Sequence, residues 1–483
     1  MNTKAKNQHL RLQLLSVLLL LPPLLVWGQQ HGTGLIFDKN IENKIPKKTR
    51  LLTRSYTSLP KSWSLRQYCP VAEDQGDYQT CVGWATAYAA RTICEVVKNG
   101  WKNKDKNTAE AFSPLFVYGN IKQSGTTECN RGTSLDDAMK LLKNTGVVKK
   151  KSFDAICVDY VSKNLKDEAS RYKIDDYFLL FGPSHSYDDA VSKTKKAISE
   201  NCPVVIAFQT FNSFKSQGFD CWNGDASGEF GHHAMCVVGY DDSKYGGAFQ
   251  LMNSWGKEWG TDGFAWVRYK DYNKYCGGAV ELYLNPATTE KPATTKPTTT
   301  KPTTVSKNQF AGSVSLRLST GETLKATLTT SDGIKCYRVT QSLISGTRYR
   351  IYLGNKQPGY VYVFSSDLQN NVAVNFPTDS QTSAALTYAS NDIALPGEKS
   401  WLELDDTCGT DYLCVLYSKY SVDVSSLLNY MKTAKGTFYQ KVQSGFNNYL
   451  CPQGDIKYDA RNITFSAYSS KAMVPVLIEF KHL

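Results

Sequence analysis

The sequence predicts an α+β chain with two folded parts, a mixed helix-and-strand part in front and a mainly-β part behind. Three observations predict this architecture. Residues 286–307 read PATTEKPATTKPTTTKPTTVSK, a Thr/Pro/Lys repeat typical of an extended linker. Residues 59–285 combine a long apolar helical run with short β-rich runs, whereas residues 308–483 alternate apolar and polar residues at strand spacing. The length of 483 residues accommodates two or three ordinary domains.

Composition and charge exclude several classes of protein. Hydrophobic residues make up 41% and charged residues 21%, which is ordinary globular composition and excludes a fibrous or wholly disordered chain. The net charge is +12, but residues 1–58 hold seven of the surplus positive charges and residues 286–307 hold three. The two folded parts share the remaining two, too few for the basic face that nucleic-acid binding usually requires. We therefore expect no nucleic-acid partner.

The first 28 residues have the pattern of a secretory signal peptide. A basic start precedes the apolar run LQLLSVLLLLPPLLV, and a VWG tripeptide then supplies residues that signal peptidase accepts. The run is short for a membrane span, although an uncleaved anchor is the competing interpretation. We expect cleavage near Gly28 and a mature chain that is secreted or periplasmic, without a stable membrane span.

Residues 59–285 contain runs that predict helices, followed by runs that predict strands. VGWATAYAARTICEVV (82–97) is apolar nearly all round, which predicts a helix buried on every side. SLDDAMKLLKNTG (134–146) has helical spacing and ends at Gly146, a suitable C-cap. The runs PVVIAFQ, HAMCVVGY and AFQLMNSW predict strands.

Residues 308–483 are predicted to be mainly β. Segments such as SVSLRLS, RYRIYLG, GYVYVFSSD and DYLCVLYS alternate apolar and polar residues between Gly, Asp and Pro turns. SSLLNYMKTAKG predicts a few helical turns. The sequence indicates no binding partner for this accessory domain.

Cys81 is the first candidate for chemistry. The chain has 13 cysteines, an odd number that leaves at least one outside intramolecular disulfides. Cys81 directly precedes the apolar helical run, with Thr80 as a plausible N-cap, and a helix N-terminus favours a thiolate. Gln75 can offer its amide to a developing oxyanion beside the backbone N–H of Cys81. Taken alone, Cys81 is more often an inert buried cysteine, so the argument needs a base.

The six histidines leave few candidates for that base. His9 belongs to the signal peptide, His31 to the N-terminal extension, His185 to a polar loop and His482 to the C-terminus, which leaves the adjacent pair His232 and His233. Successive strand residues point to opposite faces, so only one of the pair readily faces Cys81. Asn253 can orient an imidazole, and Trp255 can shield that hydrogen bond.

These segments resemble the papain-like cysteine peptidases over about residues 59–285. The family pattern Q-G-x-x-x-[ST]-C is matched from Gln75 to Cys81, H-A-x-x-x-V-G-Y from His233 to Tyr240, and N-S-W-G-x-x-W-G-x-x-G-[YF] from Asn253 to Phe264. The resemblance implies a two-lobed catalytic domain, with a helical lobe and a β-barrel-like lobe, and it selects His233 as the base. ECNRG (128–132) resembles the family's C-N-G-G segment, which implies that Gly132 offers backbone groups to the substrate.

The resemblance implies a secreted cysteine endopeptidase that acts on protein or peptide substrates through a thioester acyl-enzyme. Cys81 attacks the peptide carbonyl, His233 shuttles the proton, Asn253 holds the ring, Gln75 stabilises the oxyanion, and Trp255 and Gly132 line the substrate site. No cofactor or metal is implied. The alternatives are aminopeptidase or amide-transfer activity on the same fold, and an inactive binding or adhesion protein.

The sequence departs from the family pattern at a disulfide position and in its N-terminal extension, and each departure leads to an expectation. Tyr78 stands where the family often has a disulfide cysteine, which implies that Cys129, the usual partner, is free or differently paired. Residues 29–58 form a short N-terminal extension in place of the long helical prosegment, so we expect at most partial inhibition, with Lys47–Arg54 as a basic strip that fits a cleft.

The pattern is most similar to bacterial members. Residues 308–483 resemble a β-rich bacterial domain of unknown function found attached to peptidases and kinases.

Overall fold

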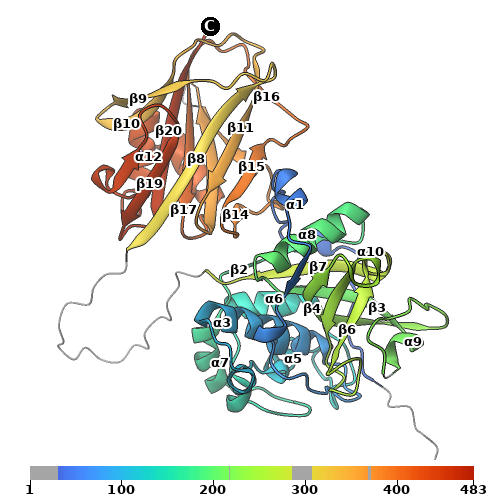
Figure 1. Cartoon of the computed structure of the whole chain (residues 1–483). Coiled ribbons are helices and arrows are strands. Elements are labelled where there is room, and N and C mark those ends of the chain that lie inside the picture. Colours follow the sequence, from blue (N-terminus) through green and yellow to red (C-terminus); the bar gives the residue numbers. More distant parts are fainter. Residues whose placement is uncertain (1–30, 217, 286–306, 368–370) are drawn as a thin grey trace, which may run out of the picture. The chain divides into compact units, whose positions relative to one another are not determined.

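The structure, a computed structural model, describes residues 31–216, 218–285, 307–367 and 371–483 (Figure 1). The predicted signal peptide (1–28) and all but the last residue of the predicted linker (286–307) lie outside these residues. No helix within the described ranges has the length and apolar character of a membrane span.

Helices form the first lobe of the front domain. The apolar run predicted as one buried helix is a continuous helical stretch in three segments, whose middle segment is π-helical and entirely buried. The lobe contains α2 (Cys81–Gly83), η3 (Trp84–Arg91), α3 (Thr92–Asn99), α4 (Lys104–Ala109), α5 (Pro114–Ile121) and α6 (Leu135–Asn144). Gly146, the predicted stop of α6, has a φ of +90°, which a glycine adopts without strain.

Thr80 is the N-cap residue of α2, as predicted, but it does not cap the helix with its side chain. The Thr80 side chain makes no capping bond, and its buried hydroxyl has no hydrogen-bond partner among the described residues. Its carbonyl instead accepts from the Gly83 and Trp84 amides, at 3.0 and 3.4 Å. True side-chain caps occur at α5, where Ser113 accepts from the Phe116 amide, and at α6, where Ser134 accepts from the Asp137 amide.

An antiparallel sheet forms the second lobe, as the β-rich runs predict. Its strands follow the order β2-β7-β3-β4-β5-β6, and β1 pairs with β4. They are β1 (Ser62–Ser64), β2 (Asp176–Phe181), β3 (Val204–Phe211), β4 (Phe230–Asp241), β5 (Ala248–Met252), β6 (Phe264–Arg268) and β7 (Cys276–Tyr283). Helices α7 (Lys163–Ala169), α8 (Tyr187–Ser199), α9 (Asn212–Lys215) and α10 (Tyr269–Tyr275) connect the chain around it.

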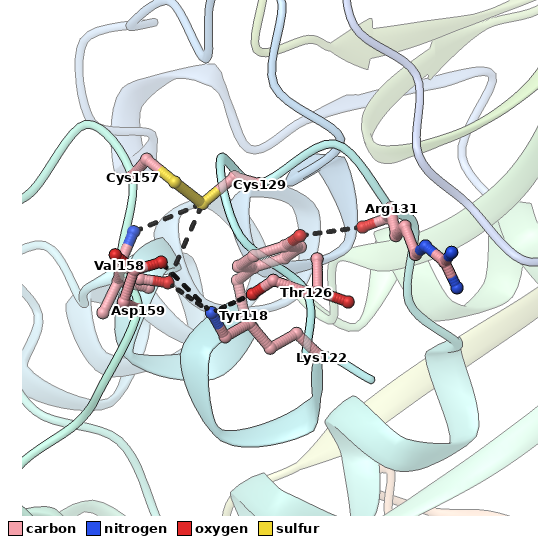
Figure 2. Close-up of a disulfide and its surroundings, with 8 residues drawn as sticks. All are labelled: Tyr118, Lys122, Thr126, Cys129, Arg131, Cys157, Val158 and Asp159. Atoms are coloured by element: carbon pink, nitrogen blue, oxygen red, sulfur yellow. Dashed lines mark hydrogen bonds and ion pairs between the residues drawn. A yellow bond between two sulfur atoms is a disulfide. The ribbon is translucent and has the colours of Figure 1, made fainter. Parts of the chain in front are cut away.

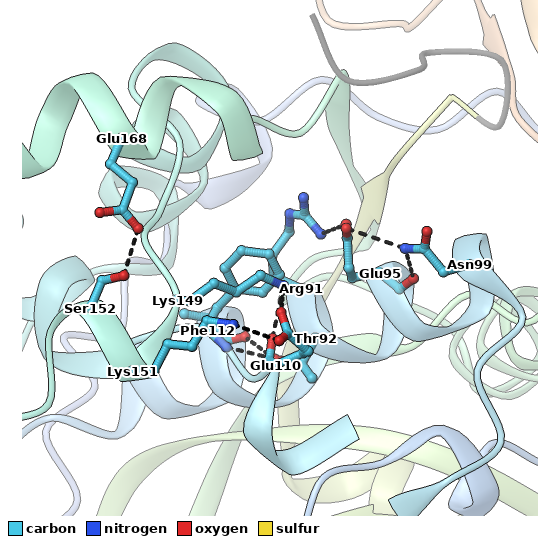
Figure 3. A network of polar contacts seen from close by, with 11 residues as sticks. Arg91, Thr92, Glu95, Asn99, Glu110, Phe112, Lys149, Lys151, Ser152 and Glu168 are labelled. Carbon is cyan, nitrogen blue, oxygen red and sulfur yellow. Dashed lines mark hydrogen bonds and ion pairs between the residues drawn. The ribbon is translucent and has the colours of Figure 1, made fainter. Parts of the chain in front are cut away.

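A buried polar network ties the helix that begins at Cys81 to its neighbours (Figure 3). The Lys149 ammonium lies 3.8 Å from the centroid of the Phe112 ring and donates to the Glu110 carbonyl at 2.8 Å. Arg91 pairs with Glu95 at 2.7 Å on the next helical turn. The helix is joined to Phe112 because the Phe112 amide donates to the Thr92 hydroxyl at 3.0 Å and the Arg91 guanidinium lies 4.3 Å from the Phe112 ring centroid.

The back domain is mainly β, as predicted. Two sheets pack around its core, in the orders β13-β12-β17-β20-β10-β9 and β15-β11-β8-β19-β18, with β14 on β12 and β16 on β11. The strands are β8 (Asn308–Leu318), β9 (Ala326–Ser331), β10 (Ile334–Val339), β11 (Arg348–Asn355), β12 (Gly359–Ser366), β13 (Val372–Phe376), β14 (Ala385–Leu386), β15 (Asn391–Leu395), β16 (Leu402–Glu403), β17 (Gly409–Ser418), β18 (Ile456–Tyr458), β19 (Thr464–Ser469) and β20 (Met473–His482).

Two helices interrupt the strands of the back domain. The predicted helical turns are α11 (Val424–Thr433). Sequence analysis missed α12 (Phe438–Phe446), although Thr437 and Gln440 form a capping box at its start, a signal that the sequence carries.

The described part of the N-terminal extension, residues 31–58, contains four stretches. Residues 31–37, which we call the cleft segment, are followed by a connecting turn, residues 38–44, that contains η1 (Ile41–Asn43). Residues 45–50, which we call the anchor, run beside β2, since the Leu179 amide donates to the Pro46 carbonyl and the Lys48 amide to the Leu179 carbonyl. Helix α1 (Arg54–Thr57) follows.

Candidate active site

Cys81 lies where the two lobes meet. It is the first residue of α2, and its side chain is fully buried. The backbone N–H of Ala234, on β4, donates to its Sγ at 3.4 Å. The fold therefore brings the sulfur beside the strand residue that follows His233.

His233 is held by Asn253 under the Trp255 indole. Its Nε2 and the Asn253 Oδ1 are 2.7 Å apart, and the indole lies stacked on the imidazole, with ring centroids 4.4 Å apart and planes 24° from parallel. An amide oxygen only accepts, so Nε2 carries the proton in this bond, and Nδ1 is the nitrogen that can take one. The structure thus brings together the three residues that the sequence singled out around the base.

Gln75 points its amide group into the same site. Its Oε1 accepts from the Ser254 hydroxyl at 2.6 Å, and its backbone amide donates to the Ser254 carbonyl at 2.8 Å. With the oxygen held in this way, the Nε2 donors face the carbonyls of Tyr78, at 2.7 Å, and Gly32, at 3.1 Å. Ser254 was not singled out from the sequence, although it lies inside the N-S-W-G motif.

The loop that carries Gly132 is braced by a disulfide (Figure 2). Cys129 forms a disulfide with Cys157, so of the two expected alternatives it is differently paired rather than free. The Tyr118 hydroxyl donates to the Arg131 carbonyl at 2.8 Å, and the Lys122 ammonium donates to the Val158 carbonyl at 2.9 Å. These contacts fix the backbone that forms one wall of the site.

The cleft segment fills this site. The Gly32 carbonyl accepts from Gln75 Nε2, at 3.1 Å, and from the Trp255 indole N–H, at 3.0 Å. Further along, the Leu35 amide donates to the His232 carbonyl at 3.2 Å, and Gly34 and Ile36 each make a backbone hydrogen bond with Thr133 at 2.9 Å. Thr133, the residue after Gly132, therefore pairs with the cleft segment, and the contact of Gly132 with substrate stays a prediction.

Glycines allow the close approach of the cleft segment. A Cβ on Gly34 would lie 2.4 Å from the backbone of Gln79, and one on Gly32 would lie 2.2 Å from the Tyr78 carbonyl oxygen. A Cβ on Gly132 would lie 2.3 Å from the Gly34 carbonyl oxygen. No larger residue fits at these three positions while the segment stays in place.

The placement expected for the extension is therefore wrong. Residues 31–37 occupy the cleft, whereas the anchor lies against β2, where Lys48 forms a buried ion pair with Glu281. The physical reason is that the glycines of the cleft segment can approach the cleft backbone, whereas the basic residues find carboxylates elsewhere, such as Asp189 for Arg50 at 3.2 Å. His31, set aside in the search for a base, lies in the site.

With the cleft filled, the nucleophile and base candidates are both held neutral. Burial raises the pKa of the Cys81 thiol to about 12, although backbone amides, first that of Ala234, oppose this shift. Burial lowers the pKa of His233 to about 4, against the opposing hydrogen bond to Asn253. The thiolate expected at the helix N-terminus is thus not favoured in this closed arrangement, because burial outweighs the backbone hydrogen bonds that stabilise it.

Comparison with known proteins identifies the front domain. Residues 59–285 match the family described as papain family cysteine protease. They form a papain-family domain. Residues 342–420 match a domain of unknown function, DUF4384, inside the back domain.

Curated relatives match over the papain-family domain. A peptidase C1-like protein of Acanthamoeba polyphaga mimivirus is 28% identical over 209 residues, which are 41% of this chain and 64% of that protein. Cathepsin J of Mus musculus is 29% identical over 226 residues, 45% of this chain and 62% of that protein. The chain thus spans less than two thirds of either relative. Among solved structures, xylellain, a cysteine protease from Xylella fastidiosa, has a TM-score of 0.44 at 22% identity and covers 53% of this chain and 97% of its own.

Proposed function

We propose that this protein is a secreted cysteine endopeptidase that hydrolyses peptide bonds with Cys81, His233, Asn253 and Gln75. The observation that carries the proposal is the joint placement of a helix-N-terminal cysteine, whose sulfur accepts from the Ala234 amide, and an imidazole held by Asn253 at 2.7 Å. A nucleophile beside an oriented base is the arrangement that acyl transfer requires.

The acylation step uses each of these groups. His233 Nδ1 takes the Cys81 thiol proton as Sγ forms a bond to the carbonyl carbon. Gln75 Nε2 and the Cys81 backbone N–H donate to the oxyanion that develops on the substrate. The tetrahedral intermediate then collapses, His233 gives its proton to the leaving amine, and a thioester remains on Cys81.

Deacylation reverses the roles. Water gives a proton to His233 and attacks the thioester carbon, and Cys81 leaves with that proton as the free acid departs. Asn253 keeps the imidazole in one orientation through both steps, and Trp255 covers the bond between them, because its ring lies stacked on His233.

Two features support secretion. Residues 1–28 have the pattern of a signal peptide, and disulfides such as Cys129–Cys157 persist in oxidising compartments. Expression of the full chain with its leader in a bacterial host, followed by N-terminal sequencing of exported protein, tests this part of the proposal. A product that remains in the cytosol with residues 1–28 attached would contradict it.

Profiling against a peptide library tests the activity. Because the cleft segment fills the site, the profile is measured on a Gly34→Val variant, whose Cβ conflicts with the Gln79 backbone and displaces the segment. We expect internal cleavage of peptides. Trimming from one end, or transfer to an added amine in place of water, would assign a different reaction to the same residues. No reaction at all with a folded variant would reject the enzyme.

A further inference from the structure

We propose that the back domain carries a second nucleophilic site, in which Ser345 attacks activated esters with His482 as its base. Asp411, His482 and Ser345 form one hydrogen-bonded chain of side chains. None of these residues belongs to the candidate active site of the papain-family domain. The inference therefore goes beyond the proposed peptidase function and does not depend on it.

The three side chains come from three separate stretches of the back domain. Strands β17 and β20 are antiparallel neighbours, and Asp411 lies near the start of β17, while His482 is the last residue of β20 (Figure 1). The stretch between β10 and β11 runs beside the end of β20, because Leu343 forms a bridge with His482 and the Ser345 amide donates to the Leu483 carbonyl at 3.2 Å. The fold of the back domain thus brings an acid, an imidazole and a hydroxyl together.

The hydrogen bonds of His482 set the direction of proton transfer. Its Nδ1 lies 3.1 Å from Asp411 Oδ2, and its Nε2 lies 3.0 Å from Ser345 Oγ. An ionised carboxylate only accepts, so Nδ1 carries the proton, and Nε2 is left to accept from the Ser345 hydroxyl. A serine bonded to an imidazole that a carboxylate orients is the arrangement that activates a hydroxyl for attack.

Burial differs along the chain of side chains. The His482 side chain has no exposed surface, whereas Ser345 is half-buried. Ser345 and Gly346 occupy the centre of a tight turn, in which the Thr347 amide donates to the Ile344 carbonyl at 3.1 Å and Gly346 has a φ of +77°. An ester can therefore approach the serine from solvent, while the base is shielded from water.

The backbone around Ser345 restricts the class of substrate. The Ser345 amide donates to the Leu483 carbonyl, and the Gly346 amide donates to the Leu404 carbonyl at 2.9 Å. Neither amide is free to stabilise an oxyanion, and one such donor is worth on the order of 10²–10³-fold in rate. Amides would react poorly without this help. The site suits esters whose leaving group departs as a stable anion, such as an aryl oxide.

The reaction balances with water as the second reactant. As Ser345 Oγ forms a bond to the acyl carbon, its proton passes to His482 Nε2, the bond to the aryl oxide breaks, and the aryl oxide takes that proton. Water then gives a proton to His482 while its oxygen attacks the acyl carbon. Ser345 takes this proton as the carboxylic acid departs. Asp411 contacts neither reactant and acts as a positioning residue.

Two measurements on the full chain test the site. They are the hydrolysis of nitrophenyl acetate and covalent labelling with a fluorophosphonate, mapped by mass spectrometry. Both use a Cys81→Ala background, so that the candidate cysteine nucleophile contributes nothing. We expect labelling at Ser345, and Ser345→Ala should lower kcat/KM for the ester on the order of 10²-fold or more. The matched control is Ser342→Ala, at an exposed serine of the same stretch, which should change neither result.

Variants of the other two residues test the base and its orientation. His482→Gln should abolish the labelling of Ser345, and Asp411→Asn should slow it, with partial recovery in Asp411→Glu. A folded chain whose Ser345 stays unlabelled would overturn the proposal, as would unchanged hydrolysis by Ser345→Ala or unchanged labelling in folded His482→Gln. If His482→Gln does not fold, the comparison of Ser345→Ala with Ser342→Ala decides. Since Cys81 is absent throughout, failure here leaves the proposed peptidase function untouched.

Discussion

The imidazole of His31 lies flat against the indole of Trp255, with ring centroids 4.9 Å apart and planes 10° from parallel. The same indole is stacked on His233, the candidate base. A residue of the N-terminal extension thus extends the aromatic stack that covers the base. Docking of the cleft segment and the protonation of two imidazoles are therefore linked.

Acid should open the cleft of the full chain. Burial lowers the pKa of docked His31, although Asp74 and Asp77 oppose the shift, and burial lowers the pKa of His233 to about 4. A lowered pKa means that docking favours the neutral rings. The free energy by which the neutral rings favour docking is fully present above the free histidine pKa of about 6.5. It is lost as the pH falls from there through the pKa values that the two histidines have in the docked state. The activity of the parent chain relative to the Gly34→Val variant should therefore rise between pH 7 and pH 5.

His31→Phe provides the control for this pH effect, because a phenyl ring keeps the stacking and cannot take a proton. The ratio of parent to Gly34→Val activity should rise less steeply on acidification when both chains carry His31→Phe. An identical slope with and without His31→Phe would show that His31 does not take part in the opening.

The two adjacent histidines should differ sharply when they are replaced. His233 is fully buried and bonded to Asn253, whereas the half-buried His232 ring stacks on Phe37, at 4.8 Å between centroids. In a Gly34→Val background, His233→Ala should lose on the order of 10²–10⁴-fold or more in kcat/KM, and His232→Ala less than about tenfold. A larger defect for His232→Ala would mean that the roles are exchanged.

The Cys129–Cys157 disulfide should contribute to both stability and activity. It closes a loop of sequence separation 28, which corresponds to about 3.6 kcal/mol of unfolding free energy. The double variant Cys129→Ser/Cys157→Ser should lower Tm, and kcat/KM should fall because the wall that carries Thr133 loses its brace. Cys408→Ser, at an exposed cysteine, is the control and should leave both unchanged. An unaltered Tm in the double variant would contradict this role.

Much of the site was predictable because its residues lie in contiguous motifs. Cys81 at a helix start and Asn253 before Trp255 followed from local pattern, whereas the choice of His233 over His232 came from the family resemblance, and the lobes then bring these residues together. The pairing of Cys129 with Cys157 was not predictable, since it depends on how two loops meet in space.

The cleft segment was missed for a physical reason. Residues 31–37, HGTGLIF, have no helical or strand periodicity, and their partners come from three separate stretches around Gln75, Thr133 and His232. Gly32 and Gly34 were the available signal, since glycines two residues apart allow close backbone approach. The basic run from Lys47 drew attention instead, because a charge run is visible in a sequence and its buried partner Glu281 is not.

Selective labelling of Cys81 is the most direct measurement of the central claim that this thiol is the nucleophile. A peptidyl epoxide is added to Gly34→Val protein, and every cysteine is then mapped by mass spectrometry. The structure describes ten other free cysteines, Cys94 and the exposed Cys408 among them, which serve as internal controls. We predict modification of Cys81 alone, its loss in His233→Ala, and no peptide hydrolysis by folded Cys81→Ala. Undiminished hydrolysis by Cys81→Ala, or equal labelling of the other thiols, would contradict the account.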